Sequence, residues 1–314
     1  MTDTVRVPGE LAATLETFFA EKGRSFAAAL PRLAARFLDH WGLRPDGPAM
    51  HGMCALVLPV VRTADGTPAV LKLQILDDES EGEPVALRVW NGDGAVRLLD
   101  HDPATGTMLL ERLDPARTLS HEPDTRAAVL VIARLLARLT AAPAPPGLRR
   151  LSDIAADMLD RTPPVLARIP DASDRRLIAD CAAALREVMA EPGDRLLHWD
   201  LHFDNVLGAD RARRLAIDPK PLAGDPAFDL WPALNNRFDP DDVVWRFDAM
   251  TDVLSLDRDR ALAWTRARLL QNALWEIEEG RPLDPEDLEL GRRLRRTAAG
   301  RRWNRPGPSR PLPS

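Results

Sequence analysis

The residues best suited to chemistry lie in one stretch, HWDLHFDNVL, at positions 198–207. It places the carboxylate of Asp200 five residues before the carboxamide of Asn205, and Asp218 follows thirteen residues after Asn205. Phosphoryl transfer uses three such groups: an Asp that accepts the proton of the attacking hydroxyl, an Asn on the same loop, and an Asp at the next strand end. The last two offer hard oxygen ligands, which suit Mg²⁺. The spacing indicates Asp200 as the base and Asn205 and Asp218 as metal ligands.

A predicted hairpin would bring Asp218 back beside Asn205. Two short apolar runs, 205–208 and 214–217, flank a polar turn in the pattern of two paired strands. Asp and Asn also occur often in turns for conformational reasons alone. The bare spacing would favour that ordinary role, but the two histidines, the hairpin and the Pro after Asp218 make a chance match much rarer.

These motifs resemble the aminoglycoside phosphotransferases, which share the fold of the eukaryotic protein kinases. Three segments, HWDLHFDNVL, LAIDPKPLAGDPAFDLWPAL and WTRARLLQNALWEIEEG, are more narrowly similar to the aminoglycoside/hydroxyurea antibiotic resistance kinases, and among them to the streptomycin 6-kinases. The resemblance implies an α+β, bilobal protein-kinase-like fold with a small antiparallel β-sheet lobe and a larger, mostly helical lobe. The sequence departs from the pattern at Trp199, where aminoglycoside kinases commonly have glycine, and it has no G-x-G-x-x-G loop.

A strand lysine is the expected phosphate ligand. Residues 53–75 form two apolar runs joined by Asp65-Gly66, which signals a β-hairpin, and Lys72 lies inside the second run. From the pattern alone, such a Lys ordinarily points to solvent at a sheet edge. The kinase resemblance implies instead that Lys72 binds the phosphates of ATP and pairs with a helix glutamate, for which Glu83 is the candidate. Pro84 places Glu83 near a helix start, which leaves this pairing open.

A second strand pair is predicted at 95–100 and 107–112. The residues that follow it resemble the hinge between kinase lobes. By this resemblance, backbone groups near Glu111 and Leu113 contact the adenine of the nucleotide.

The hinge divides the chain into a sheet lobe at 1–112 and a helical lobe at 113–300. The tail, 301–314, is rich in Arg and Pro and is predicted to be disordered. Apolar periodicity and Gly and Pro positions predict helices at 8–20, 25–41, 123–140, 152–159, 174–189, 241–254, 257–280 and 284–299.

Acceptor binding is assigned to the last of the three family-like segments and to the residues after Asp229. Asn272 precedes Trp275, Glu276 and Glu279 by three, four and seven residues, so the four share one helical face. Carboxylates and a flat aromatic surface suit a polycationic antibiotic; the alternative is a solvated acidic face anchored to the core by the tryptophan. Spacing alone favours the solvated face, and the resemblance brings the two about level. The expected acceptor contacts are Asp200, Trp231, Asn235, Gln271, Asn272, Trp275, Glu276 and Glu279.

Composition narrows the class of protein. The 314 residues are 45% hydrophobic and 29% charged, which is ordinary for a soluble globular protein. The net charge of −6 argues against a nucleic-acid surface and is compatible with a cationic substrate. Cys54 and Cys181 are far apart, so neither a disulfide framework nor a zinc site is expected. With no secretory segment and no run long enough to cross a membrane, we expect a cytoplasmic protein.

These observations predict an ATP- and Mg²⁺-dependent O-phosphotransferase that modifies an aminoglycoside. The resemblance points to streptomycin at its 6-hydroxyl, and hence to antibiotic resistance. The alternatives are a kinase for hydroxyurea or another small hydroxylated metabolite, a catalytically silent kinase-fold protein, and a metal-dependent phosphohydrolase. The intact set of Lys72, Asp200, Asn205 and Asp218 argues against silence, and six histidines in the whole chain argue against the hydrolase. The choice between ATP and GTP, the oligomeric state and the role of Lys220 stay open.

Overall fold

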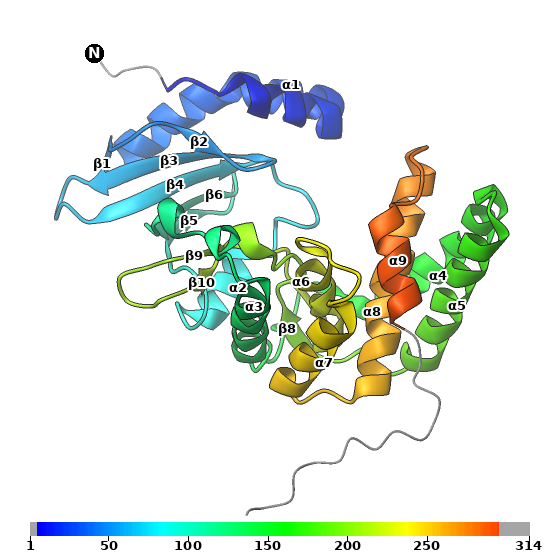
Figure 1. The fold of residues 1–314 in the computed structure, drawn as a ribbon. Helices are drawn as coiled ribbons and strands as arrows, with labels where there is room; N and C mark the ends of the chain where they lie inside the picture. Colours follow the sequence, from blue (N-terminus) through cyan, green and yellow to red (C-terminus); the bar gives the residue numbers. More distant parts are fainter. Residues whose placement is uncertain (1–4, 295–314) are drawn as a thin grey trace, which may run out of the picture.

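A six-stranded antiparallel sheet forms the small lobe in the computed structural model, which describes residues 5–294 (Figure 1). The strands follow the order β1-β3-β4-β6-β5, and β2 lies beside β3. The bounds are β1 Leu43–Pro45, β2 Met50–His51, β3 Ala55–Arg62, β4 Pro68–Gln74, β5 Leu98–Asp102 and β6 Thr107–Glu111. Both predicted strand pairs are present, although β5 begins at Leu98 and not at the predicted residue 95.

The β3–β4 hairpin explains why the Lys72 side chain points to the face of the sheet opposite the N-terminal helix. Its turn is the predicted one: Gly66 has a φ of 72°, which glycine adopts without steric cost, and Asp65 Oδ1 accepts the Thr67 N–H at 2.9 Å. Leu71 and Leu73 pack into the core beneath the N-terminal helix. Because successive side chains of a strand point to opposite faces, Lys72 must point away from that helix.

Helix α1 (Gly9–His40) covers the outer face of the sheet (Figure 1). The two predicted N-terminal helices form this single run, which is interrupted at Ala20, where φ is 48°. After the kink the chain passes so close to the first segment that a Cβ on Gly23 would collide with the carbonyl of Leu15. Glycine is therefore required by close packing at this position.

The large lobe is mostly helical, as predicted, with three short strands and a small hairpin at its junction with the sheet lobe (Figure 1). Its helices are α3 Thr125–Leu139, α4 Leu151–Arg168, α5 Ala172–Val188, α6 Trp231–Asn235, α7 Val243–Leu254, α8 Arg258–Glu278 and α9 Pro285–Arg293. The strands are β7 Arg149–Arg150, β8 Arg195–Leu197, β9 Val206–Leu207, β10 Leu215–Ala216 and β11 Leu222–Gly224. The predicted tail at 301–314, and the end of the helix predicted at 284–299, lie outside the described residues.

Helix α4 is longer than predicted. It was expected to end at residue 159, but it continues through Pro163 and Pro164 to Arg168. Proline removes a backbone donor and usually interrupts a helix. Here the buried face persists at helical spacing through Met158, Thr162 and Val165, so tertiary packing outweighs the local preference.

Two hydrophobic cores underlie the two lobes, but they do not divide at residue 112. One core joins α1 to the outer face of the sheet. Helix α2 (Glu83–Trp90) lies before the proposed boundary, yet its Ala86, Leu87 and Trp90 belong to the larger core, together with the helical lobe. The division into 1–112 and 113–300 stays a prediction; the packing ties α2 to both sides.

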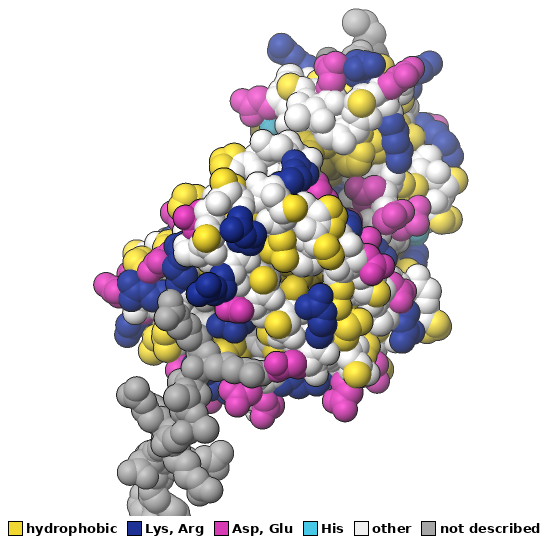
Figure 2. Space-filling view, turned by 90° about the vertical axis from the view of Figure 1, so that its right-hand side faces the viewer, with side chains coloured by type: hydrophobic (Ala, Val, Ile, Leu, Met, Phe, Trp, Pro, Cys, Tyr) yellow, Lys and Arg dark blue, Asp and Glu magenta, His cyan; other side chains and the backbone are white. Residues whose placement is uncertain are grey.

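Two global properties follow from the described part of the chain. Between residues 5 and 294, no helix combines the length and apolar character needed to cross a membrane. On the face over α4, α5 and α9, basic and acidic side chains are interspersed, without a continuous basic field (Figure 2).

Candidate active site

A buried carboxylate, Asp229, holds the start of the catalytic loop. The loop leaves β8, and the backbone N–H groups of His198 and Trp199 donate to Asp229 Oδ2 and Oδ1 at 2.8 and 2.7 Å. The His198 ring lies 3.0 Å from the carbonyl of Ile217 through Nε2, and burial lowers the pKa of His198 to about 3. A neutral imidazole facing a carbonyl must donate from Nε2. His198 is thus a structural residue, and Asp229 stabilises the loop.

Burial raises the pKa of Asp229 to about 7, although the two N–H groups act in the opposite direction. The ordinary value is about 3.9, so between pH 4 and 7 the folded protein holds a proton that the unfolded chain has lost. Stability should therefore fall as pH rises through this window, by at most roughly 1.4 kcal/mol per pH unit. We expect Asp229→Asn to flatten this slope in urea unfolding measured at several pH values. Equal slopes for both proteins would contradict the assignment.

Trp199 occupies a position that favours glycine. Its φ is 70°, in the left-handed region that a residue with a Cβ rarely enters. The indole is buried and forms a T-shaped contact with Phe228, and the guanidinium carbons of Arg149 and Arg268 each lie 4.7 Å from its ring centroid. The departure from the glycine of the resembled kinases therefore exchanges backbone freedom for packing behind the catalytic loop.

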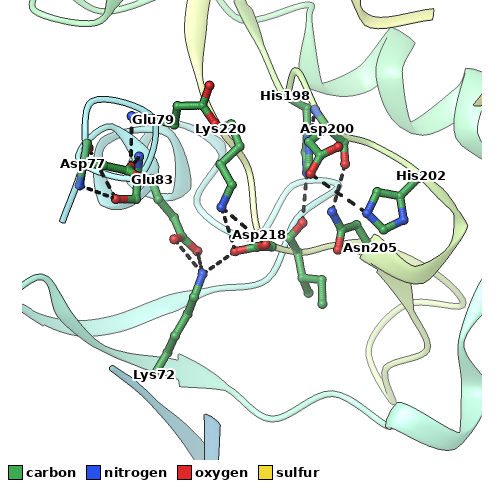
Figure 3. Close-up of polar contacts among 12 residues, drawn as sticks. Lys72, Asp77, Glu79, Glu83, His198, Asp200, His202, Asn205, Asp218 and Lys220 are labelled. Atoms are coloured by element: carbon green, nitrogen blue, oxygen red, sulfur yellow. Dashed lines mark hydrogen bonds and ion pairs between the residues drawn. The ribbon is translucent and has the colours of Figure 1, made fainter. Parts of the chain in front are cut away.

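Asp200 and Asn205 lie on this loop as the spacing predicts (Figure 3). Asn205 Nδ2 donates to the backbone carbonyl of Asp200 at 2.9 Å, which closes the loop upon itself. The Asp200 side chain is 37% exposed, and Nε2 of His202 lies 4.0 Å from its Oδ2. Burial raises the pKa of Asp200, while His202 and Arg268 oppose the shift. The carboxylate is thus both held in place and open to an incoming hydroxyl.

The predicted hairpin is present and returns Asp218 to this loop. Strands β9 and β10 pair antiparallel, and the Ile217 N–H donates to the Asn205 carbonyl at 2.9 Å. Asp218 then turns sharply, with a φ of 55°. The three groups that the sequence singled out are therefore assembled by one loop and one hairpin.

Lys72 joins this cluster from the sheet lobe (Figure 3). Its Nζ lies 2.8 and 2.7 Å from the two carboxylate oxygens of Glu83 and also contacts Asp218 Oδ1. The Lys72–Glu83 pair, which the sequence left open, is formed, and the sheet-edge alternative for Lys72 is wrong because Lys72 is buried. Burial lowers the pKa of Lys72, but the carboxylates of Asp218 and Glu83 outweigh it, so the pKa is raised.

Removing Lys72 should destabilise the fold, because Glu83 is fully buried. Loss of one partner of a buried ion pair typically costs about 3–5 kcal/mol, since the other charge remains uncompensated. We expect Lys72→Met to lose stability of this order in urea unfolding. Adding Glu83→Gln should recover much of it; a double variant no more stable than Lys72→Met would refute this account.

The structure places Lys220, whose role the sequence left open, beside Asp218. Its Nζ is 3.5 Å from both carboxylate oxygens of Asp218, and its side chain is 22% exposed. Lys72 and Lys220 together overcome burial and lower the pKa of Asp218, which is therefore ionised. Lys220 belongs to the cluster and is not a freely exposed residue.

The donor set fits a magnesium ion that shares its ligands with phosphate. Asp218 offers an ionised carboxylate, and the amide oxygen of Asn205 is available because its nitrogen is the atom bound to Asp200. Within residues 5–294, no group of three His, Cys, Asp or Glu side chains could hold a metal unaided. A cation here would take its other ligands from water and phosphate oxygens, as Mg²⁺ commonly does.

The predicted hinge is tied to the catalytic hairpin by a residue that the sequence did not reveal. Arg211, in the β9–β10 turn, donates to both carboxylate oxygens of Glu111 at 2.7 Å. The Glu111 N–H donates to the Arg97 carbonyl at 2.9 Å, so only its carbonyl could serve an adenine ring. Leu113 is buried beside it. The expected nucleotide contacts at Glu111 and Leu113 stay predictions.

A cavity of about 330 Å³ opens beside Asp200. Of the expected acceptor residues, Asp200, Trp231, Asn235 and Asn272 line it. Its further lining residues, which the sequence analysis did not single out, include His202, Arg237, Arg268 and Glu286. This cavity brings the proposed base and a polar wall together.

The other expected acceptor residues do not line this cavity, because the segment before α9 and α9 itself cover much of the predicted face. Glu276 accepts the Asp284 N–H at 3.1 Å, and Gln271 is buried. Trp275 is half-buried against the core, and Glu279 is an exposed partner of Arg281. These four side chains lie outside the cavity beside Asp200, and their role as acceptor contacts stays a prediction.

Asp287 is a second residue that sequence reasoning missed. It accepts hydrogen bonds from Asn235 and Asn272 at 2.9 and 2.8 Å, and burial raises its pKa to about 6. It thereby joins α6, α8 and α9 behind the cavity. No sequence signal marks this contact, since its partners lie 52 and 15 residues away.

The fold and this site define a phosphotransferase of the protein-kinase-like class. An aminoglycoside phosphotransferase in a ternary complex with ADP and hygromycin B superposes with a TM-score of 0.54 at 15% identity, over 83% of this chain and 95% of that one. The macrolide 2'-phosphotransferase of Brachybacterium faecium gives 0.55 at 17% identity, over 87% and 99%. At such identities the likeness concerns the fold alone.

The chain belongs to the aminoglycoside/hydroxyurea antibiotic resistance kinases, whose family model matches residues 40–280. It is 60% identical to a hydroxyurea phosphotransferase of Kitasatospora aureofaciens, over 90% of this chain and 83% of the relative. It is 55% identical to a streptomycin 6-kinase of Streptomyces glaucescens, over 93% and 97%, and 49% identical to one of Streptomyces griseus, over 88% and 93%. The protein is thus a kinase, as the motifs predicted.

Proposed function

We propose that this kinase transfers the γ-phosphoryl group of ATP, with Mg²⁺, to the 6-hydroxyl of streptomycin and so confers resistance. The observation that carries the proposal is the position of Asp200, which lies between the Lys72–Asp218 cluster and a polar cavity of about 330 Å³. Pockets for drug-sized ligands span about 300–1,000 Å³. The relatives named streptomycin 6-kinase support this acceptor.

In this proposal each charged group has one task. The nucleotide lies between the lobes, with its adenine near Glu111 and Leu113 and its phosphates at Lys72, which Glu83 keeps in place. Asn205 and Asp218 hold Mg²⁺, which neutralises phosphate charge when bound. Asp200 accepts the hydrogen of the acceptor hydroxyl and aligns its oxygen with the γ-phosphorus. Such transfer depends mainly on positioning and electrostatic stabilisation.

The charge change explains how resistance would arise. A phosphate adds negative charge to a drug that is otherwise polycationic. It also adds bulk at a hydroxyl, so the modified drug no longer fits the site for which its cationic form is suited.

Hydroxyurea is the second candidate, because a relative named hydroxyurea phosphotransferase is 60% identical to this chain. The cavity argues for the larger acceptor. A cavity of about 330 Å³ leaves room for an acceptor larger than hydroxyurea, which supports streptomycin as the first candidate.

Acceptor-dependent turnover tests the proposal. Purified protein with ATP and Mg²⁺ is supplied in parallel with streptomycin, with hydroxyurea and with other aminoglycosides, and ADP release is followed. NMR of the isolated product locates the phosphate. Streptomycin-dependent ADP release with a 6-phosphate product is the expected result; turnover with hydroxyurea alone would select the second candidate, and ATP binding without either would overturn both acceptors.

A further inference from the structure

Arg268 is a buried cation in the wall of the cavity beside Asp200, and two of its donor nitrogens have no hydrogen-bonding partner among the described residues. It lies on α8, lines the cavity, and is only 7% exposed. Its Nε and Nη1 are covered from solvent, and the described residues give them no hydrogen bond. A buried donor without a partner typically costs about 1–3 kcal/mol, and more when charged. Such a group calls for an explanation.

The surroundings keep Arg268 charged but leave its donors unused. Its guanidinium carbon lies 4.7 Å from the ring centroid of Trp199 and 5.5 and 5.8 Å from those of Phe228 and Trp275. Burial lowers its pKa to about 10, against the opposing fields of Asp200 and Asp229. Cation–π contacts stabilise the charge without engaging N–H groups. Because Arg268 also lines the cavity, a ligand bound there can meet its N–H groups.

The same wall holds complementary groups. Trp231 Nε1 is a buried donor without a partner among the described residues, and Asn235 Oδ1 is a buried acceptor without one. Both residues line the cavity with Arg268. Donors predominate here, so the missing partner is a ligand rich in oxygen at this wall. Asp200 and Glu286 line the same cavity, so cationic groups of an acceptor are expected beside these carboxylates and its oxygens beside Arg268.

We propose that Arg268 binds an oxygen of the acceptor next to the hydroxyl that Asp200 receives. This inference rests on the proposed function and defines the class of acceptor. The acceptor carries a hydroxyl group and a second oxygen that accepts hydrogen bonds, and two atoms lie between the two oxygens. The guanidinium donates to the second oxygen while the carboxylate takes the proton of the first. Arg268 is thereby an acceptor-binding, specificity-determining residue.

This chemistry unites the two acceptors for which the relatives are named. In hydroxyurea, nitrogen and carbon separate the hydroxyl oxygen from the carbonyl oxygen. In the cyclitol ring of streptomycin, two carbons separate the 6-hydroxyl oxygen from the neighbouring hydroxyl oxygen. One pair of side chains, Asp200 and Arg268, can therefore read both molecules at the same two atoms.

The test compares Arg268→Met and Arg268→Lys with Arg149→Met. Arg149 is the matched control, because its guanidinium carbon also lies 4.7 Å from the centroid of Trp199 but it does not line the cavity. We expect Arg268→Met to lower acceptor kcat/KM by roughly 10–100-fold, the size of a hydrogen bond to a charged group, with KM for ATP unchanged. Arg268→Lys should recover only part, since an ammonium lacks the planar fork. Arg149→Met should keep the wild-type preference among acceptors.

Comparing two acceptors on the same protein gives a second test, which does not require Arg268→Met to fold. Hydroxyurea and N-hydroxyguanidine differ at the second oxygen, whose place is taken in the latter by a nitrogen that is a donor when protonated. Wild-type protein should prefer hydroxyurea, and Arg268→Lys should weaken that preference. Equal use of both by wild-type protein, or an Arg268→Met variant with wild-type acceptor kcat/KM, would overturn the role of Arg268.

Calorimetry separates this inference from the proposed function. Acceptor binding by the wild-type protein without turnover would refute the proposed reaction, and a Kd weakened in Arg268→Met but not in Arg149→Met would still support Arg268. An acceptor Kd unaffected by either variant would refute the role of Arg268 and leave the proposed function standing. Binding of neither streptomycin nor hydroxyurea would overturn both.

Discussion

Asp200→Asn should lower kcat by about 10²–10⁴-fold, the contribution typical of a positioned general base, while ATP still binds. The amide keeps the size of the carboxylate but cannot take the proton of the acceptor hydroxyl. The backbone carbonyl of Asp200, not its side chain, receives the Asn205 amide, so the loop should keep its shape. Steady-state turnover with the acceptor identified by the product assay, together with the Kd of ATP, measures both halves of the expectation.

Asp204→Asn is the matched control, because it removes a carboxylate from the same loop at a side chain that is 67% exposed. It should retain kcat close to that of the wild-type protein. If Asp200→Asn kept kcat within tenfold of wild type, Asp200 would not be the base. The position of Asp200 would then no longer support the cavity beside it as the acceptor-binding site.

Residues close together along the chain could be predicted from the sequence. Asp200, Asn205 and Asp218 are joined by a short loop and a two-stranded hairpin, and local spacing and turn chemistry determine both. The strand pattern alone favours a solvent-facing Lys72 at a sheet edge, and only the family resemblance predicts it in the site. Its partner Glu83 needed the structure, since Pro84 obscured the start of the helix.

Residues brought together by contacts between distant segments of the chain could not be predicted in the same way. Arg211 reaches Glu111 across 100 positions, and Asp287 reaches Asn235 across 52. No local sequence pattern predicts contacts between residues so far apart along the chain. Arg268 left a partial signal, because it precedes Asn272 and Trp275 by four and seven residues and so shares their face of α8. Its importance depends on burial and on unused donors, which a sequence does not display.

Where the structure differs from the sequence-based expectation on α4 and α8, tertiary packing is the cause. The acidic face of α8 was judged by its spacing, which is regular, but α9 and the residues before it cover it and bind Glu276 and Asn272. The prolines of α4 were judged by their local cost, which the buried face of the helix outweighs. In both places the energy of burial, which depends on distant residues, overrode a correct local preference.

Asp218→Asn should abolish the part of the ATP affinity that depends on Mg²⁺. The carboxylate is ionised, and Lys72 and Lys220 both lie against it, so it is the principal negative charge facing the phosphates. An amide cannot supply that charge to a divalent cation. We expect kcat to fall by at least about 10²–10³-fold, the cost of losing one preorganised electrostatic group. The Kd of ATP, measured with Mg²⁺ and again with EDTA, isolates the metal-dependent part from catalysis.

Asp210→Asn provides the comparison, since Asp210 is fully exposed in the turn of the same hairpin. Wild-type protein and Asp210→Asn should bind ATP more tightly with Mg²⁺ than with EDTA, and Asp218→Asn should show little difference between the two. The lysines explain a further expectation: without the carboxylate, Lys72 and Lys220 are freed for the phosphates, so metal-free ATP should bind Asp218→Asn at least as tightly as it binds the wild-type protein. A variant that kept the full effect of Mg²⁺ would place the metal ligands elsewhere, and with them the phosphates that Lys72 is positioned to meet.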